Sequence, residues 1–159
     1  GEKKKQTVEC SADLAVSANI PSGYVSSNQQ RMDLYRRIAA IRSQEDASDL
    51  LDELMDRYGD PPKPVYALLD VALLRASAAR AGISDISQKE RQIRFVVADF
   101  DAESIASLVT SAKYRRRPVV NAGDVPALTL TLQPKEPVLE TALAFTEDLR
   151  LARESEETA

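Results

Sequence analysis

The first half of the chain carries apolar residues at the spacing of amphipathic helices. In one segment they recur at i, i+1, i+4, i+5 and i+8, as Leu50, Leu51, Leu54, Met55 and Tyr58. Positions three and four apart lie on one side of an α-helix, so this pattern predicts a helix with one buried side. Similar stripes predict an earlier helix that opens at Ser27 and a later one that begins near Pro64.

The expected ends of these helices are marked by residues with defined conformational roles. Ser27 and Gln30 have the spacing of a capping box, in which each side chain bonds the other residue's backbone amide. Ser43 is expected to cap the second helix. Gly59 falls where a left-handed C-cap belongs, and Gly82 is expected to end the third helix.

The second half of the chain changes to short alternating segments. Leucine and threonine alternate over residues 127–133, which predicts a strand with one buried face. In all we expect strands over residues 8–16, 83–87, 92–98, 118–121 and 127–133, and helices over residues 101–112 and 138–153. The order predicts an α+β fold: N-terminal helices packed with a small mixed β-sheet and two further helices.

The polar ends of the chain suggest its domain limits. Residues 1–7 are polar and basic, and we expect a disordered lead-in or linker there. Residues 154–159 form an acidic tail, which we also expect to be disordered. The remaining residues, 8–153, are enough for a single α+β domain with a sizeable core.

The composition argues against an enzyme. The chain has no histidine, the commonest general acid/base, and Cys10 is its single cysteine. That composition is incompatible with an ordinary zinc site or a Cys-His dyad. The five glycines are too scattered for a phosphate-binding loop. We therefore expect no catalysis, no cofactor and no metal.

Charge and hydropathy bear on location and partners. The formal net charge is −4, which does not favour nucleic-acid binding by the whole surface. No apolar run approaches the roughly 20 residues that span a bilayer. A lone cysteine suits a reducing compartment. We expect a cytoplasmic protein without membrane contact.

Two stretches carry a resemblance to a known family. The first runs over residues 13–21 (DLAVSANIP) and continues in residues 28–39 (NQQRMDLYRRIA). The second is residues 53–59 (ELMDRYG), followed by a proline pair. In sequence, order and separation they resemble the C-terminal domain of bacterial transcription-repair coupling factors (Mfd). The chain departs from that pattern at Ala15, where proline is frequent, and at Asn19, where an aromatic residue is common.

The resemblance implies a part of a much larger DNA translocase, which displaces stalled RNA polymerase and recruits nucleotide-excision repair. In that family the C-terminal domain folds against a UvrB-like N-terminal domain of the same chain. There it covers the surface that would bind UvrA and restrains the ATPase motor. The expected function is therefore autoinhibition by masking. The expected partners are the UvrB-like domain directly, and UvrA and RNA polymerase indirectly.

Glu53, Asp56 and Arg57 are the candidate contact residues. They stand at i, i+3 and i+4, so they line one stripe of a helix away from Leu50 and Leu54. Taken alone, such a stripe is most simply a solvated face. With the resemblance, we expect it to contact the UvrB-like domain, because a guanidinium flanked by carboxylates offers directional recognition.

A basic run over residues 113–117 supports a second hypothesis. Its four cations surround one tyrosine, Tyr114, and are Lys113, Arg115, Arg116 and Arg117. They could contact phosphates while Tyr114 stacks on a base, as in a stand-alone nucleic-acid-binding module. The run is short and the chain is acidic overall, so a solvated loop is the favoured interpretation. DNA contact by this domain is not expected.

Overall fold

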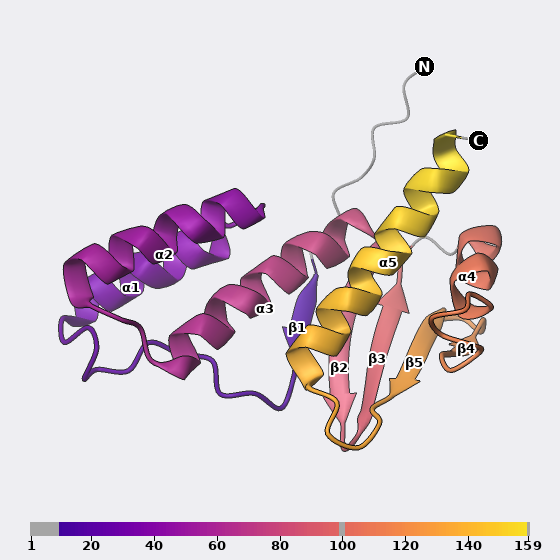
Figure 1. The fold of residues 1–159 in the computed structure, drawn as a ribbon, viewed down its shortest axis with the longest axis horizontal. Helices are drawn as coiled ribbons and strands as arrows, with labels where there is room; N and C mark the ends of the chain where they lie inside the picture. Colours follow the sequence, from indigo (N-terminus) through magenta and orange to yellow (C-terminus); the bar gives the residue numbers. More distant parts are fainter. Residues whose placement is uncertain (1–9, 99–100, 159) are drawn as a thin grey trace. The chain divides into compact units, whose positions relative to one another are not determined.

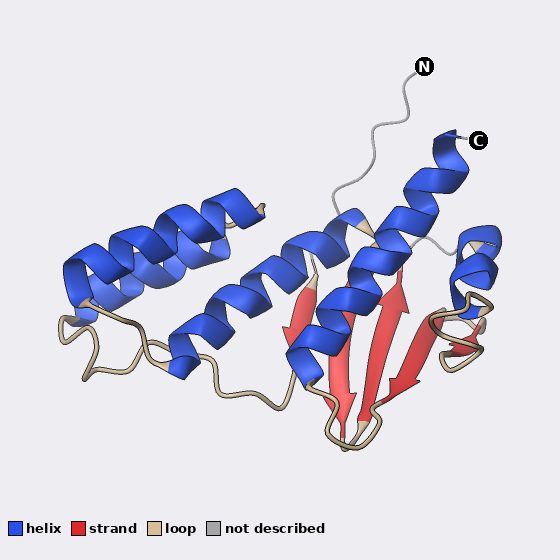
Figure 2. Cartoon of the chain, in the orientation of Figure 1, coloured by secondary structure: helices blue, strands red, loops and turns tan. Residues whose placement is uncertain are grey.

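The structure is a computed structural model that describes residues 10–98 and 101–158. Its helices are α1 (Asn28–Ala39), α2 (Gln44–Tyr58), α3 (Lys63–Arg80), α4 (Ala102–Val109) and α5 (Val138–Thr158). Its strands are β1 (Ser11–Asp13), β2 (Ile83–Lys89), β3 (Gln92–Val97), β4 (Val119–Asn121) and β5 (Ala127–Thr131). The predicted α+β class is confirmed (Figures 1 and 2). The expected lead-in, residues 1–7, lies outside the described residues.

The contacts within the chain divide it into two compact units. Residues 16–76 form the first, called here the helical unit, which contains α1, α2 and most of α3. The second, called the sheet unit, contains residues 10–15 and 77–158 of the described chain, with the strands, α4 and α5. The boundary falls inside α3, between Ala76 and Ser77. A single domain over residues 8–153 stays a prediction.

Aliphatic side chains fill the core of the helical unit. The buried set is Ile20, Val25, Leu34, Ile38, Ile41, Ala47, Leu50, Leu54, Val65, Leu69 and Ala72. The predicted apolar stripe of α2 lies partly in this core: Leu50 and Leu54 are buried, and Leu51 packs against them. Met55 is the exception, with 45% of its surface exposed. Burial of one helix side, rather than helix propensity, is what stabilises such short helices.

The caps of α1 and α2 follow the sequence in part. The Ser27 hydroxyl accepts a hydrogen bond from the Gln30 amide (3.2 Å), as a capping box requires. The return bond is absent among the described contacts, because the Gln30 side chain accepts from the Tyr58 hydroxyl instead (3.1 Å). Ser43 caps α2 by accepting from the amide of Asp46 (3.1 Å), as predicted.

Gly59 ends α2 in a conformation that differs from the predicted left-handed cap. Its φ of 84° is positive, but its ψ of −169° is extended rather than helical. This region of backbone space is open essentially to glycine alone. The chain therefore leaves α2 abruptly, before the prolines that precede α3.

The sheet unit is built on a mixed five-stranded sheet. The strand order is β1-β2-β3-β5-β4, in which β1 pairs with β2 in parallel and the other pairs are antiparallel. Phe95 on β3 lies opposite Leu128 on β5, and both are fully buried. α5 crosses this face of the sheet, where the Phe145 ring packs on Phe95 with 4.7 Å between centroids (Figure 1).

Two helices of the sheet unit differ in length from the prediction. α4 ends at Val109, three residues before the predicted end at residue 112. α5 continues to Thr158, so residues 154–158 of the predicted acidic tail are helical. Arg150 pairs with Glu147 (2.7 Å) and Glu154 (2.8 Å), one turn before and one turn after it. Such i, i+3 and i, i+4 pairs favour an exposed helix end.

Candidate functional site

Glu53, Asp56 and Arg57 lie together on α2, and we call these three residues the α2 stripe. Asp56 and Arg57 are exposed, and Glu53 is half-buried. The core side of the same helix carries the buried Leu50 and Leu54. The predicted separation of charged and apolar sides is therefore present.

Glu53 is held by a residue that sequence analysis did not single out. Arg37 on α1 donates to both Glu53 carboxylate oxygens, one of them at 3.3 Å. Within α2, the Arg57 guanidinium lies 3.9 Å from the same carboxylate. The hydrogen bond from Arg37 holds the pKa of Glu53 below its usual value. Arg37 is 16 residues before Glu53, so no spacing rule within one helix could have identified it.

Aromatic contacts fix the end of α2 beneath Arg57. The Arg57 guanidinium lies 5.3 Å from the centroid of the Tyr58 ring. Tyr58 packs on Tyr24 with 5.8 Å between centroids. The Tyr24 hydroxyl donates to the carbonyl of Gly59 (2.7 Å), which directly follows the helix, and it lies 3.2 Å from the carbonyl of Leu54. The Tyr24 side chain thus holds the backbone at the C-terminal end of α2, next to the α2 stripe.

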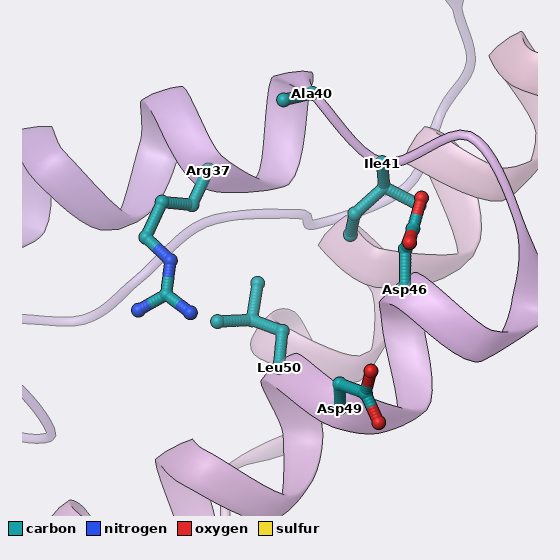
Figure 3. Close-up of a pocket in the computed structure, with 6 residues that line it drawn as sticks. All are labelled: Arg37, Ala40, Ile41, Asp46, Asp49 and Leu50. Atoms are coloured by element: carbon teal, nitrogen blue, oxygen red, sulfur yellow. The ribbon is translucent and has the colours of Figure 1, made fainter.

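A shallow hollow of about 230 Å³ lies beside the stripe between α1 and α2. Its lining residues are Arg37, Ala40, Ile41, Asp46, Asp49 and Leu50 (Figure 3). Figure 3 shows Leu50 between Arg37 of α1 and Asp49 of α2. Within the described chain, no group of three or more His, Cys, Asp or Glu side chains could hold a metal ion. The hollow offers a small surface of mixed charge.

In the basic run, two of the predicted phosphate-contact residues are paired within the sheet unit. The Lys113 ammonium lies 2.7 Å from the Asp148 carboxylate on α5. Arg117 donates to both carboxylate oxygens of Glu136, one of them at 3.1 Å, and to the Thr131 carbonyl (2.9 Å). Hydrogen bonding to Arg117 holds the pKa of Glu136 below its usual value.

Tyr114, the aromatic centre of this run, is a core residue. Its side chain is 6% exposed, and its ring meets Phe145 edge-on at 5.3 Å. The hydroxyl donates to Asp148 (2.5 Å). Base stacking by Tyr114 would require the ring to leave the core, so that part of the nucleic-acid hypothesis is not supported by the fold. Arg115 and Arg116 remain exposed.

Comparison with known proteins decides the family. A family model described as the TRCF domain matches residues 14–108, more than half of the chain. The chain belongs to the TRCF domain family. The match covers the helical unit and both motifs that carry the resemblance, except for Asp13 at the start of the first, and it continues into the sheet unit as far as α4.

Curated relatives of this TRCF domain are transcription-repair-coupling factors. The protein of Staphylococcus epidermidis is 28% identical over 104 residues, which are 65% of this chain and 9% of the relative. That of Mycobacterium tuberculosis is 41% identical over 75 residues, which are 47% of the chain and 6% of the relative. The chain therefore spans less than a tenth of the length of the curated relatives that it matches.

A solved structure has the same fold. It is the crystal structure of the C-terminal domain of a transcription-repair coupling factor, with a TM-score of 0.77 at 21% identity. The superposition covers 96% of this chain and 99% of that one. The TRCF fold thus extends over both units. In residues 10–98 and 101–158, none of the helices combines the length and the apolar character that crossing a bilayer requires.

Proposed function

We propose that this chain is the C-terminal regulatory domain of a transcription-repair coupling factor, and that it acts by masking. The observation that carries the proposal is the family match over residues 14–108. The proposed role is to hold the parent translocase in a low-activity state. The domain would cover the UvrA-binding surface of the UvrB-like N-terminal domain and restrain the ATPase motor until RNA polymerase is engaged.

The α2 stripe is the proposed contact with the UvrB-like domain. Asp56 and Arg57 are exposed, while Glu53 is oriented by Arg37. A guanidinium between two carboxylates can meet complementary charges in one register only, which favours partner choice over raw affinity. Exposed ion pairs are also individually weak, so the contact can be released.

Tethering makes a weak contact sufficient. Two domains of one chain meet at an effective concentration in the millimolar range when the linker allows it, so modest affinity holds the closed state. By linkage, UvrA binding to the uncovered surface must favour the open state. The mask therefore needs a coupling free energy of only about 1–3 kcal/mol.

The alternative function is a stand-alone nucleic-acid-binding module that uses Lys113, Arg115, Arg116 and Arg117. Two of these cations already neutralise carboxylates of the chain, at Asp148 and Glu136. The proposal of masking has better support for that reason. The alternative requires DNA affinity that falls steeply with salt and disappears when the four cations are replaced.

The decisive experiment compares two sets of surface substitutions in the full-length parent. In the test variant Glu53, Asp56 and Arg57 are replaced by alanine. In the matched control D33A/R36A, an exposed ion pair of α1 is removed. We expect the test variant alone to raise UvrA binding and basal ATPase activity without polymerase. A folded test variant with wild-type UvrA affinity and ATPase activity would place the contact elsewhere.

A further inference from the structure

The outer strand of the sheet presents apolar side chains to solvent. β4 is last in the order β1-β2-β3-β5-β4, so within the described chain it pairs with β5 on one side alone. Val119 is 65% exposed and Val120 is 40% exposed, and Val125 in the following hairpin loop is 53% exposed. An exposed apolar strand at a sheet edge is a template for another extended chain.

Two exposed arginines lie next to this edge. Arg115 and Arg116 have positive φ values of 46° and 63°, a conformation that long side chains rarely adopt. Arg115 makes a local bond to the Ala112 carbonyl (3.3 Å). Among the described residues, no carboxylate lies within ion-pair distance of either guanidinium. Arg116 is three positions before Val119, so the two lie within about 11 Å along the chain.

The turn that carries these arginines is fixed from both sides. Before it, the Tyr114 hydroxyl is bonded to Asp148 on α5. After it, Arg117 is bonded to Glu136 and to the Thr131 carbonyl of β5. The amide of Arg116 also donates to the Val109 carbonyl at the end of α4 (2.6 Å). The two outward cations are therefore held beside the strand by contacts that leave both side chains exposed.

We propose that β4 docks an extended segment of a partner protein that carries acidic residues at one end and alternating apolar residues along its length. The segment adds to the sheet as a further strand, through backbone hydrogen bonds to the outer side of β4. Because alternate residues of a strand share one face, its apolar side chains cover Val119, the more exposed of the two valines. Its acidic end pairs with Arg115 and Arg116, which sets the direction of the added strand.

The chemistry of this edge favours such a segment over two other occupants. Valines offer no stacking surface to nucleic-acid bases, and the tyrosine of this region is buried. A second copy pairing through β4 would present the residues Val119–Asn121, which carry no carboxylate to meet Arg115 and Arg116.

The test uses the whole chain and four fluorescein-labelled synthetic peptides. All contain the same alternating valine–threonine strand. The first carries three glutamates before the strand and the second carries them after it. The third is the tighter of these two with every residue of the strand N-methylated, and the fourth is the tighter of the two with lysines in place of its glutamates. Fluorescence anisotropy measures binding.

We expect one direction to bind at least about five-fold more tightly than the other, because the arginines lie at one end of β4. N-methylation removes backbone donors and should weaken binding at least ten-fold, as a rough expectation. The lysine peptide should not bind. Equal binding in both directions, or unchanged binding after N-methylation, would overturn the proposal.

Two protein variants match this peptide series. R115N/R116N removes both charges and places asparagine, which tolerates positive φ, at both positions. K135N is the control, because Lys135 is exposed with a φ of 67° on another loop. We expect the double variant to bind the tighter peptide about five-fold more weakly than the wild type does. The control variant should bind it as tightly as the wild type.

Three further outcomes would overturn the proposal. The first is an equal effect of the two variants on peptide binding. The second is binding of a single-stranded oligonucleotide without binding of any peptide. The third is self-association of the free chain, seen by light scattering and lost when Val119 and Val120 are changed to lysine. The variants that carry the test are confined to β4 and the preceding turn. Failure here would therefore leave the experiment on the α2 stripe unaffected.

Discussion

The α2 stripe and the basic run of residues 113–117 look alike in the sequence, since each is a short cluster of charged residues with a tyrosine in it or directly after it. In the structure they differ. Asp56 and Arg57 stay at the surface of α2, and only Glu53 is engaged by another helix. The basic run is instead fastened to the sheet unit at Lys113, Tyr114 and Arg117.

The difference shows that charged residues close together in the sequence do not always form a surface that is available to a partner. A cation that already pairs with a carboxylate of its own chain has little attraction left for an outside anion. Within the described residues, the basic run thus presents two guanidinium groups that are not paired with a carboxylate, where the sequence has four cations. Substitutions of anchored residues should therefore cost more stability than substitutions of surface residues.

The largest loss of stability is expected at Phe145, which packs against Tyr114 of the basic run. Phe145 is fully buried between Phe95 and the edge-on ring of Tyr114. F145A should lower the free energy of unfolding by about 3–5 kcal/mol, measured by urea denaturation. L151A is the control on the same helix, because Leu151 is 54% exposed. Equal losses for the two variants would contradict the anchored arrangement.

The next effect concerns the end of the helix that carries the stripe. Gly59 has a φ of 84°, so any side chain there is strained. G59A should lower the free energy of unfolding by about 1–3 kcal/mol in the same assay. G23A serves as control, since no heavy atom lies within 4 Å of a methyl group added there. A neutral G59A would mean that α2 can end in another way.

A smaller effect is expected from the Tyr114 hydroxyl. Y114F removes its hydrogen bond to Asp148 and should cost about 1.5 kcal/mol. Burial, together with the bond to Asp148, raises the pKa of Tyr114 above its ordinary value of 10.0. As pH rises, the Tyr114 hydroxyl therefore loses its proton in the unfolded chain before it does so in the folded chain. Its contribution to the free energy of unfolding is complete below the ordinary tyrosine pKa and falls as pH rises above that pKa.

The check is the free energy of unfolding at pH values on either side of the ordinary tyrosine pKa. Above that pKa, stability should fall more steeply with pH in the wild type than in Y114F. Parallel pH profiles for the two proteins would show that Tyr114 ionises as freely in the folded state as in the unfolded chain.

The smallest effect on stability is expected from the stripe itself. Replacing Glu53, Asp56 and Arg57 with alanine removes exposed or half-buried charges and introduces the best helix former. The thermal midpoint should stay within experimental error of the wild type, because surface ion pairs contribute little. A clear drop would show that the bond from Arg37 to Glu53 stabilises the helical unit, so that the stripe is structural.

Much of the fold could be predicted from the chain itself. The sequence determined the order of helices and strands, the caps at Ser27 and Ser43, and a positive φ at Gly59. These features depend on side chains a few residues apart, so periodicity and capping chemistry reveal them. The same local rules placed the α2 stripe on a polar helix side, while its contact with the UvrB-like domain stays a prediction.

Tertiary structure decided which polar groups are engaged. Arg37 meets Glu53 across 16 positions, Tyr114 meets Asp148 across 34, and Gln30 turns from its expected capping bond to Tyr58 across 28. No local pattern encodes these pairs, because they form only when buried apolar faces bring distant elements together. Local rules determine where a charge lies on its helix, and packing determines whether that charge is still available to a partner.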